Sequence, residues 1–234
     1  MIIDTGPAIL LRLYQDLWKF EKVLDFQLET SFKQPVIGVD EVGRGPLAGP
    51  VVSCACIFFD YSLSIEELKE INDSKKLSFQ KRQKAFKLIL KMKKENKLDF
   101  GIGLASVKEI DKVNILNATI LSMKRAVQKL KILHGTIIVD GNIKFNIEKL
   151  SCKNFIKGDQ ISLSIASASI IAKVYRDRYM VKIGRDYPYF KWHKNAGYGT
   201  IEHRHQIQLR GITQHHRKSF KPIKTFIQNN DSTC

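Results

Sequence analysis

The chain of 234 residues is long enough for one domain of ordinary size, and its 44% apolar content supports a sizeable core, which excludes a wholly disordered protein. Lys and Arg number 39 against 23 Asp and Glu, so we expect a polyanionic partner, most commonly nucleic acid. The four cysteines form no CxxC pair, and no apolar run approaches the roughly 20 residues of a membrane span. We therefore expect a reducing, cytoplasmic setting and no association with a membrane.

The first 33 residues differ from the rest in charge. Acidic residues slightly outnumber basic ones there, whereas basic residues outnumber acidic ones by 13 to 4 over residues 170–234. Apolar residues of the first segment recur at helical spacing, at Leu10, Leu13, Leu17 and Phe20. We therefore interpret residues 1–33 as an amphipathic helical appendage that takes no part in the chemistry.

From Pro35 onward the pattern is that of an α/β protein. Short apolar runs predict strands at 35–40, 51–59 and 136–140, and we predict two further strands at 99–106 and 151–156. Longer stretches with helical periodicity predict helices at 79–96, 114–133, 161–183 and 200–210. Within the third helix, residues 164–172 are mostly Ser and Ala, which allows close packing on a neighbour. We expect a catalytic domain over residues 34–222 and a flexible tail over 223–234.

The first predicted strand ends in two adjacent acids, Asp40 and Glu41, and continues into a turn rich in glycine and proline. Two neighbouring carboxylates are costly unless a cation neutralises them, and an oxygen-seeking divalent metal ion does so. Glycine at positions 43 and 45 would let the backbone approach a ligand closely, and Arg44 would meet a phosphate. The alternative interpretation is a solvated turn.

Another predicted strand, 136–140, also ends in an acid, Asp140, followed by glycine. Taken alone this pattern is typical of a plain turn after a strand. Two strands that end in acids indicate a binding site more strongly than one such strand does, because ligands of open α/β sheets bind where strands end.

A further acid lies on the long helix predicted at 161–183. Lys173 and Asp177 are four residues apart, so they share one face of that helix. The simpler alternative is an ordinary surface ion pair. The functional interpretation places Asp177 beside the strand-end acids as a metal ligand and directs Lys173 toward phosphate.

The four acids Asp40, Glu41, Asp140 and Asp177 lie on a strongly basic protein. A positively charged protein surface attracts a polyanion, and a cluster of carboxylates within that surface would bind a metal ion. This combination is typical of two-metal phosphodiester hydrolysis, in which one ion activates water and the other stabilises the leaving 3′ oxygen.

These residues lie in motifs that resemble the type 2 ribonucleases H, the ribonuclease HII family. The matching stretches are GVDEVGRGPLAGPVV at 38–52, INDSKKLS at 71–78, VNILNATILSM at 113–123, IVDG at 138–141, SIASASIIAKVYRDRYM at 164–180 and HKNAGYGTIEHR at 193–204. The resemblance covers about residues 35–220. It implies a ribonuclease H-like fold, a mixed five-stranded sheet flanked by helices, with a helical C-terminal extension.

The resemblance also implies an activity. The family cleaves the RNA strand of RNA/DNA hybrids and cuts duplex DNA at embedded ribonucleotides, leaving 5′-phosphate and 3′-hydroxyl ends. It uses Mg²⁺ or Mn²⁺, with two divalent ions expected during catalysis, and four acids that we map onto Asp40, Glu41, Asp140 and Asp177. We expect a cytoplasmic monomer whose partners are these nucleic acids. The short apolar segment Ile223–Phe226 makes a replication clamp a further candidate partner.

The resemblance implies residues that recognise ribose as well. Backbone groups of Gly43, Arg44 and Gly45 would read the ribose 2′-hydroxyl, which distinguishes RNA from DNA, and Tyr198 would pack on the next sugar. The alternative for Tyr198 is a loop aromatic that fills a crevice. Ser74 and Lys75 are candidate phosphate contacts, although a solvated helix start would explain them too.

Two departures from the family pattern stand out. Tyr175 occupies a position that is usually small in the motif, and residues 214–220 follow the family's C-terminal motif only roughly. Two other classes of function remain open. One is a nucleic-acid-binding module without catalysis, which convergence of the acids would disfavour. The other is a different metal nuclease of the same superfamily, such as a resolvase or an integrase-like enzyme, against which the glycine turn and Tyr198 argue.

Overall fold

The computed structural model describes residues 23–231 and contains one mixed five-stranded sheet in the order β3-β2-β1-β4-β5. The strands are β1 (Val36–Val42), β2 (Val51–Phe58), β3 (Leu98–Ala105), β4 (Gly135–Asp140) and β5 (Leu150–Phe155). Strands β1, β2 and β3 pair antiparallel, whereas β4 lies parallel to both β1 and β5. The expectation of a mixed five-stranded sheet is therefore confirmed.

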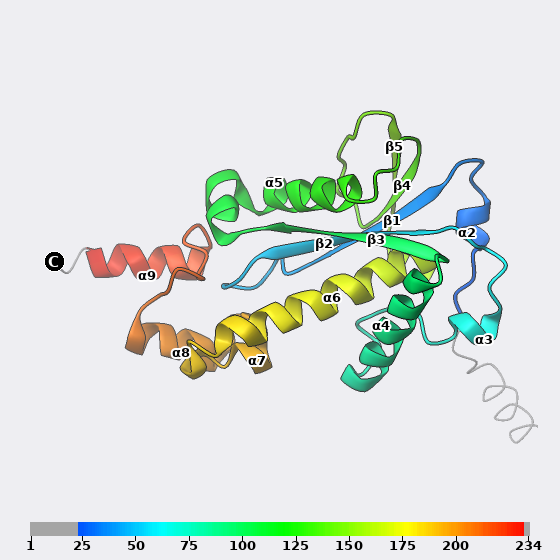
Figure 1. The fold of residues 1–234 in the computed structure, drawn as a ribbon. Helices are drawn as coiled ribbons and strands as arrows, with labels where there is room; N and C mark the ends of the chain where they lie inside the picture. Colours follow the sequence, from blue (N-terminus) through cyan, green and yellow to red (C-terminus); the bar gives the residue numbers. More distant parts are fainter. Residues whose placement is uncertain (1–22, 232–234) are drawn as a thin grey trace, which may run out of the picture.

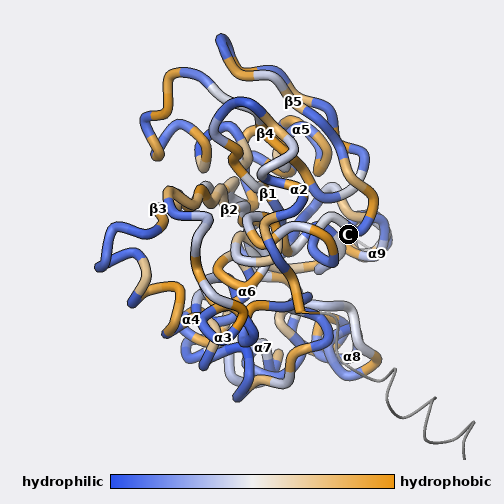
Figure 2. The backbone as a smooth tube through the Cα atoms, turned by 90° about the vertical axis from the view of Figure 1, so that its right-hand side faces the viewer, coloured by the Kyte–Doolittle hydropathy of each residue, from blue (hydrophilic) through white to orange (hydrophobic). Residues whose placement is uncertain are grey.

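Helices cover both faces of the sheet (Figure 1). The longer ones are α4 (Phe79–Lys94), α5 (Val107–Gln128), α6 (Leu163–Gly184), α8 (Ile201–Arg210) and α9 (Lys221–Asp231). Shorter turns are α2 (Gln27–Thr30), α3 (Ile65–Leu68), α7 (Trp192–Asn195) and the 3₁₀ helices η1 (Gly158–Gln160) and η2 (Pro188–Phe190). Figure 2, turned by 90°, shows α5 on one side of the strands and α4, α6 and α8 on the other. No helix within residues 23–231 is long and apolar enough to cross a membrane.

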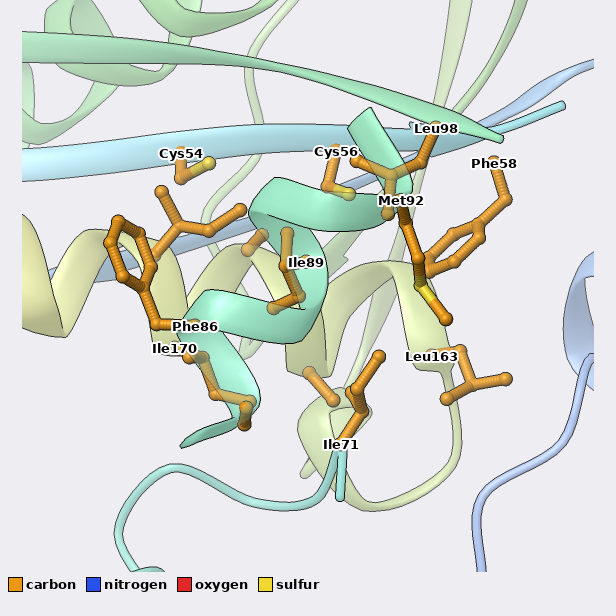
Figure 3. Close-up of a cluster of buried hydrophobic side chains, with 14 of the residues drawn as sticks. Cys54, Cys56, Phe58, Ile71, Phe86, Ile89, Met92, Leu98, Leu163 and Ile170 are labelled. Carbon is orange, nitrogen blue, oxygen red and sulfur yellow. The ribbon is translucent and has the colours of Figure 1, made fainter. Parts of the chain in front are cut away.

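The central strand β2 is buried along its whole length because both of its faces are covered. Successive side chains of a strand point to opposite faces. Cys54 and Cys56 therefore pack with α4 and α6 (Figure 3), whereas Ala55 and Ile57 pack with α5. This explains why the sequence of β2 is a continuous apolar run and not an alternating one.

The long helix α6 passes directly against β1. A Cβ atom on Gly38 of β1 would lie only 2.3 Å from the backbone carbon of Ser164, so only glycine permits this approach. The Ser- and Ala-rich segment 164–172 is almost entirely buried along this contact, as its composition predicts. The contact carries the side chains of α6 close to the acidic end of β1.

Helix α5 begins earlier than the periodicity predicts, at Val107 instead of residue 114. Ser106 and Glu109 form a capping box, because the Ser106 side chain accepts from the Glu109 amide and the Glu109 carboxylate accepts from the Ser106 amide. Asn114 has a positive φ of 66°, so a kink separates the first turns from the rest. The S-x-x-E pattern was the available signal for this start.

The predicted N-terminal helix lies mostly in residues 1–22, outside the described residues. Residues 23–33 pack against the domain: Leu24 and Phe26 are buried in the same cluster as α4 and α6. Glu29 is fully buried, and its Oε1 accepts hydrogen bonds from the Ser162 hydroxyl (2.6 Å) and the Ser164 amide (2.9 Å). A carboxylate of this segment therefore caps the N-terminus of α6.

We expect Glu29→Ala to lower the free energy of unfolding by about 2–4 kcal/mol, because it removes two hydrogen bonds to a buried carboxylate and leaves their donors unpaired. Glu29→Gln should lose less than half as much, since its amide oxygen still accepts. Urea unfolding measures both, with Glu148→Ala, an exposed acid, as the control. Equal stability of Glu29→Ala and the parent would contradict the capping role.

The C-terminal segment differs from the expected flexible tail. Helix α9 extends through Asp231, and Ile223 is fully buried in a cluster that includes Leu47 and Ile207. The helix forms because its apolar residues find a groove beside α8, a partner that the local sequence does not reveal. Residues 232–234 lie outside the described residues.

Candidate active site

The strand-end acids come together at one edge of the sheet, as predicted. Strands β1 and β4 are parallel neighbours in a register that pairs Val39 with Val139. The next residues, Asp40 and Asp140, therefore lie side by side where the pairing of β1 with β4 ends. Asp40 is only 4% exposed, and its Oδ1 accepts a hydrogen bond from the Glu41 amide (2.7 Å).

The environment of Asp40 and Glu41 disfavours their ionised forms. Burial raises the pKa of Asp40 well above its usual value, and the neighbouring charges of Glu41 and Asp140 raise it further. A hydrogen bond from Ser169 of α6 opposes that rise. Burial also raises the pKa of Glu41, although Arg44 offsets part of the effect. Such a group of acids is stabilised when a cation enters it.

The fourth acid at this edge is Asp159, which the sequence analysis missed. Asp159 lies in η1 between β5 and α6 and is buried. The preceding residue, Gly158, donates its amide hydrogen to Asp140 Oδ1 (2.7 Å), which anchors η1 at the acidic edge. Burial raises the pKa of Asp159 to about 6, with the negative charges of Asp140 and Asp73 as further causes. The available signal was a third parallel strand, β5, followed closely by an acid.

The structure does not bring Asp177 to this group, which corrects its predicted place. Asp177 Oδ1 pairs with Lys173 Nζ at 2.8 Å, and Asp177 Oδ2 lies 3.9 Å from Arg82 Nη1. Eight residues separate Asp177 from Ser169, which touches Asp40, and at 1.5 Å per residue this is roughly 12 Å along α6. The simpler interpretation, an ion pair four residues apart, describes Lys173 and Asp177 in this structure.

The chemistry of the converging side chains fits a divalent metal ion. Within residues 23–231, no three His, Cys, Asp or Glu side chains are already arranged as a coordination group. The site nevertheless gathers Asp40, Glu41, Asp140 and Asp159, and hard cations prefer such carboxylate oxygens. The raised pKa values of three of the four show that bound positive charge would relieve their mutual repulsion and burial.

The candidate phosphate contacts lie next to the acids. The Ser74 hydroxyl is buried, 2.8 Å from the Ser169 hydroxyl, and so lies behind Asp40. Lys75 Nζ lies 3.9 Å from Asp159 Oδ2. Partial burial lowers the pKa of Lys75, but the carboxylates of Asp40, Asp159 and Asp140 raise it overall. In this structure Lys75 is therefore a counter-charge for the acids.

The glycine turn and Tyr198 lie side by side near the acids. A Cβ atom on Gly45 would lie 3.5 Å from the Tyr198 ring, which is about half exposed. Arg44 reaches back to the carboxylate of Glu41 at 3.4 Å. The predicted ribose-reading residues thus form one surface that continues into the acidic edge.

Two buried arginines brace this turn, and the sequence analysis assigned neither a role. Arg217 donates to the carbonyl oxygens of Gly43 (2.5 Å), Arg44 (2.9 Å) and Gly49 (2.9 Å). Arg176 donates to the carbonyl oxygens of Pro50, Ala48 and Ala196 at 2.9–3.1 Å. Burial lowers the pKa of Arg217 to about 9 and that of Arg176 to about 10. No short-range pattern signals such contacts.

Gly43 shows how closely Arg176 approaches the turn. Gly43 has φ +94°, and a Cβ atom there would lie 2.1 Å from Arg176 Nε. Any side chain at position 43 would therefore displace the brace and strain the backbone.

The fold and the acidic edge define a nuclease of the ribonuclease H class. The sequence matches the family model for ribonuclease HII over residues 37–223. A ribonuclease HII of Wolbachia pipientis is 50% identical over 203 residues, which cover 87% of this chain and 98% of the relative. The ribonuclease HII of Macrococcus caseolyticus is 43% identical over 218 residues, 93% of this chain and 78% of the relative. The chain belongs to the ribonuclease HII family and is a metal-dependent hydrolase with ribonuclease H activity.

Solved structures agree with this fold. The ribonuclease HII of Archaeoglobus fulgidus, solved in a complex with PCNA, aligns with a TM-score of 0.63 at 23% identity, covering 80% of this chain and 95% of that one. The ribonuclease H2 of Pyrococcus horikoshii aligns with a TM-score of 0.62 at 24% identity, covering 83% and 98%. Bst-RNase HIII in complex with Mn²⁺ aligns with a TM-score of 0.60 at 18% identity, covering 86% and 71%.

Proposed function

We propose that this enzyme cleaves the RNA strand of RNA/DNA hybrids and cuts duplex DNA at single embedded ribonucleotides. One observation carries the proposal: the turn at Gly43–Gly45 and the ring of Tyr198 form one surface beside the converging acids. A nuclease without selectivity for ribose would need the acids but not this surface. The hydrolysis would leave a 5′-phosphate and a 3′-hydroxyl.

Asp40, Glu41, Asp140 and Asp159 would hold the divalent ions, and Asp159 takes the place that we first gave to Asp177. Two such ions, Mg²⁺ or Mn²⁺, supply an activated water and charge stabilisation for the leaving 3′ oxygen. Asp40 and Asp140, at the ends of paired strands, provide a rigid base for the site. Lys75 Nζ, which lies 3.9 Å from Asp159 Oδ2, would be close enough to the acids to contact the phosphate backbone of a bound substrate.

Ribose recognition would rest on the backbone of the glycine turn. Backbone groups reach a 2′-hydroxyl without an intervening side chain, and Tyr198 would pack on the following sugar. Neither contact involves base edges, so we expect indifference to base identity and a requirement for at least one ribose. Arg217 and Arg176 hold the carbonyl groups of this turn in place before substrate arrives.

We further propose that the enzyme acts as a monomer in the cytoplasm. The Archaeoglobus fulgidus relative was solved in a complex with PCNA, which keeps a replication clamp as a candidate partner. The segment Ile223–Phe226 lies within α9, and Ile223 is fully buried. Docking of that segment on a clamp would therefore require α9 to leave its groove.

The experiment that tests the function compares a DNA duplex containing one ribonucleotide with the same duplex made only of DNA. We expect cleavage of the first with Mg²⁺ or Mn²⁺, none with chelator, and none of the all-DNA duplex. Cleavage of both duplexes would favour a general metal nuclease. Tight binding of both without cleavage would favour a binding module.

We expect Tyr198→Ala to lose about 100-fold in kcat/KM at a lone ribonucleotide, because catalysis needs the scissile phosphate aligned to within about an ångström. The loss on a long RNA/DNA hybrid should be smaller, since many registers there offer a ribose. Tyr175→Ala removes a tyrosine of similar exposure on α6 and serves as the control. Equal losses on both substrates would indicate a general structural role for Tyr198.

A further inference from the structure

Two buried histidines lie directly behind Tyr198. His203 of α8 and His216 are 0% and 1% exposed, and their Nε2 atoms lie 3.1 Å apart. The rings of Phe190 and Trp192 pack around both. Burial lowers the pKa of His203, and it lowers that of His216 to about 3, with the neighbouring histidines adding to the effect. Both imidazoles are therefore neutral at neutral pH, and each carries one ring hydrogen.

The hydrogen bonds determine which nitrogen carries that hydrogen in His216. The Thr213 amide donates to His216 Nδ1 (2.9 Å), so Nδ1 must be an acceptor without a hydrogen. The single ring hydrogen of His216 is therefore on Nε2, and it points at Nε2 of His203.

The same reasoning extends to His203. Its Nε2 faces two donors, the His216 ring at 3.1 Å and the indole Nε1–H of Trp192 at 3.2 Å, so it must be an acceptor. The hydrogen of His203 is therefore on Nδ1, which donates to the backbone oxygen of Tyr198 (2.8 Å). The bonds run in one direction, from Thr213 through His216 and His203 to Tyr198.

This chain of bonds joins the two halves of the ribose-reading surface. The residue after His216 is Arg217, whose guanidinium holds the carbonyl groups of Gly43 and Arg44. Two further backbone bonds tie this segment to the glycine turn: the Gly49 amide donates to the His215 oxygen and the Arg217 amide donates to the Leu47 oxygen. Residues 213–217 therefore anchor the turn on one side and the backbone of Tyr198 on the other.

We infer that His203 and His216 are positioning residues that set Tyr198 against the glycine turn and so determine ribose selectivity. The inference rests on the proposed role of Tyr198. Tyr198 has two other backbone bonds, from its amide to the Asn195 oxygen and from the Thr200 amide to its own oxygen, both within its local loop. The loop also contacts the turn directly, because the Leu47 and Ala48 amides donate to the Gly197 oxygen. The bond from His203 Nδ1 is the side-chain contact that joins the Tyr198 carbonyl oxygen, through His216, to residues 213–217.

Substitution of each histidine by asparagine and by glutamine tests the roles of Nδ1 and Nε2 one at a time. The amide nitrogen of asparagine lies near the position of histidine Nδ1, and that of glutamine lies near Nε2. His203→Asn therefore keeps the donor to Tyr198, whereas His203→Gln loses it. At His216 the order is reversed, since His216→Gln keeps the donor to His203 and His216→Asn loses it.

We expect His203→Gln and His216→Asn to lose about 10-fold in kcat/KM at a lone ribonucleotide, with most of the loss in kcat and little change on a long hybrid. His203→Asn and His216→Gln should retain activity within about threefold of the parent. Equal losses within each pair, at equal melting temperature, would overturn the inference. Because all four variants alter buried residues, each melting temperature is measured alongside.

A double-mutant cycle distinguishes this inference from the proposed function. If His203 acts through Tyr198, then His203→Gln adds less than about twofold to the loss in a Tyr198→Ala background. Additive losses would show that His203 acts elsewhere and would overturn the inference. If the single variant Tyr198→Ala keeps the parent's selectivity for ribose, the proposed role of Tyr198 is wrong, independently of the results for the histidine variants.

Nitrogen NMR of the parent protein tests the bonds without any activity. We expect His203 as the Nδ1–H tautomer and His216 as the Nε2–H tautomer, both neutral at pH 7 and both with ring hydrogens slow to exchange. An Nε2–H tautomer for His203, or an imidazolium at either position, would contradict the chain of bonds.

Discussion

Asp40→Asn is expected to abolish cleavage while leaving duplex binding and folding intact. Loss of a side chain that only orients a metal ligand typically costs roughly 10–100-fold in metal affinity or activity, so loss of a direct carboxylate ligand should cost more than about 100-fold in kcat. Affinity for the duplex should persist, because it depends on Lys and Arg contacts to phosphate. Burial and the charges of Glu41 and Asp140 already disfavour the ionised carboxylate of Asp40. The neutral amide should therefore leave the melting temperature equal to or above that of the parent.

Three measurements check this expectation: single-turnover cleavage with Mg²⁺, equilibrium binding of the uncleaved duplex, and thermal unfolding. A cleavage rate near that of the parent would show that Asp40 holds no metal. Loss of binding together with activity would mean that Asp40 organises the binding surface itself.

The second large effect should separate Asp159 from Asp177. We expect Asp159→Asn to lose more than about 100-fold in kcat, since Asp159 lies buried beside Asp140 and its pKa is raised to about 6 by burial and the acids around it. Asp177→Asn should lose less than about threefold, because Asp177 is paired with Lys173 and Arg82, and such partly exposed pairs contribute little.

The two variants make the same chemical change, so each is the control for the other. Cleavage is compared at several Mg²⁺ concentrations, because loss of a metal ligand also weakens metal binding and raises the Mg²⁺ concentration that cleavage requires. If Asp177→Asn were the inactive variant and Asp159→Asn the active one, the assignment drawn from the structure would be reversed.

Local sequence patterns predicted most of the sheet. All five strands begin and end within a residue or two of the predicted positions. Strands β1, β2 and β4 are short, largely apolar runs bounded by turn residues, whereas β3 and β5 include polar residues or glycine. Helix α5 was placed too late, although its capping box at Ser106 is a local signal. The apolar residues of α9 recur at helical spacing, at Ile223, Phe226 and Ile227, but the groove that they occupy is formed by distant residues.

The family, the mixed sheet and the pairing of the strands that carry Asp40 and Asp140 can be predicted from the amino-acid sequence alone. These follow from contiguous motifs and from the geometry of parallel strands, in which neighbouring ends meet. The identity of the further acid that joins them depends on how the helices pack in the folded chain. Asp159 and Asp177 both lie on helices that follow β5 in the chain, but η1 is tied to Asp140, whereas roughly 12 Å of α6 separates Asp177 from the residue that contacts Asp40.

The residues that hold the site in shape could not be predicted from the sequence either. Arg217 braces Gly43 across 174 positions of the chain, and Glu29 caps α6 across 133. Such contacts depend on which distant residues the folded chain brings together, and neither residue type nor sequence spacing reveals that proximity. The sequence therefore determined which chemistry this protein performs, and the packing of α6 and of the segment 213–217 decided which residues hold its site in shape.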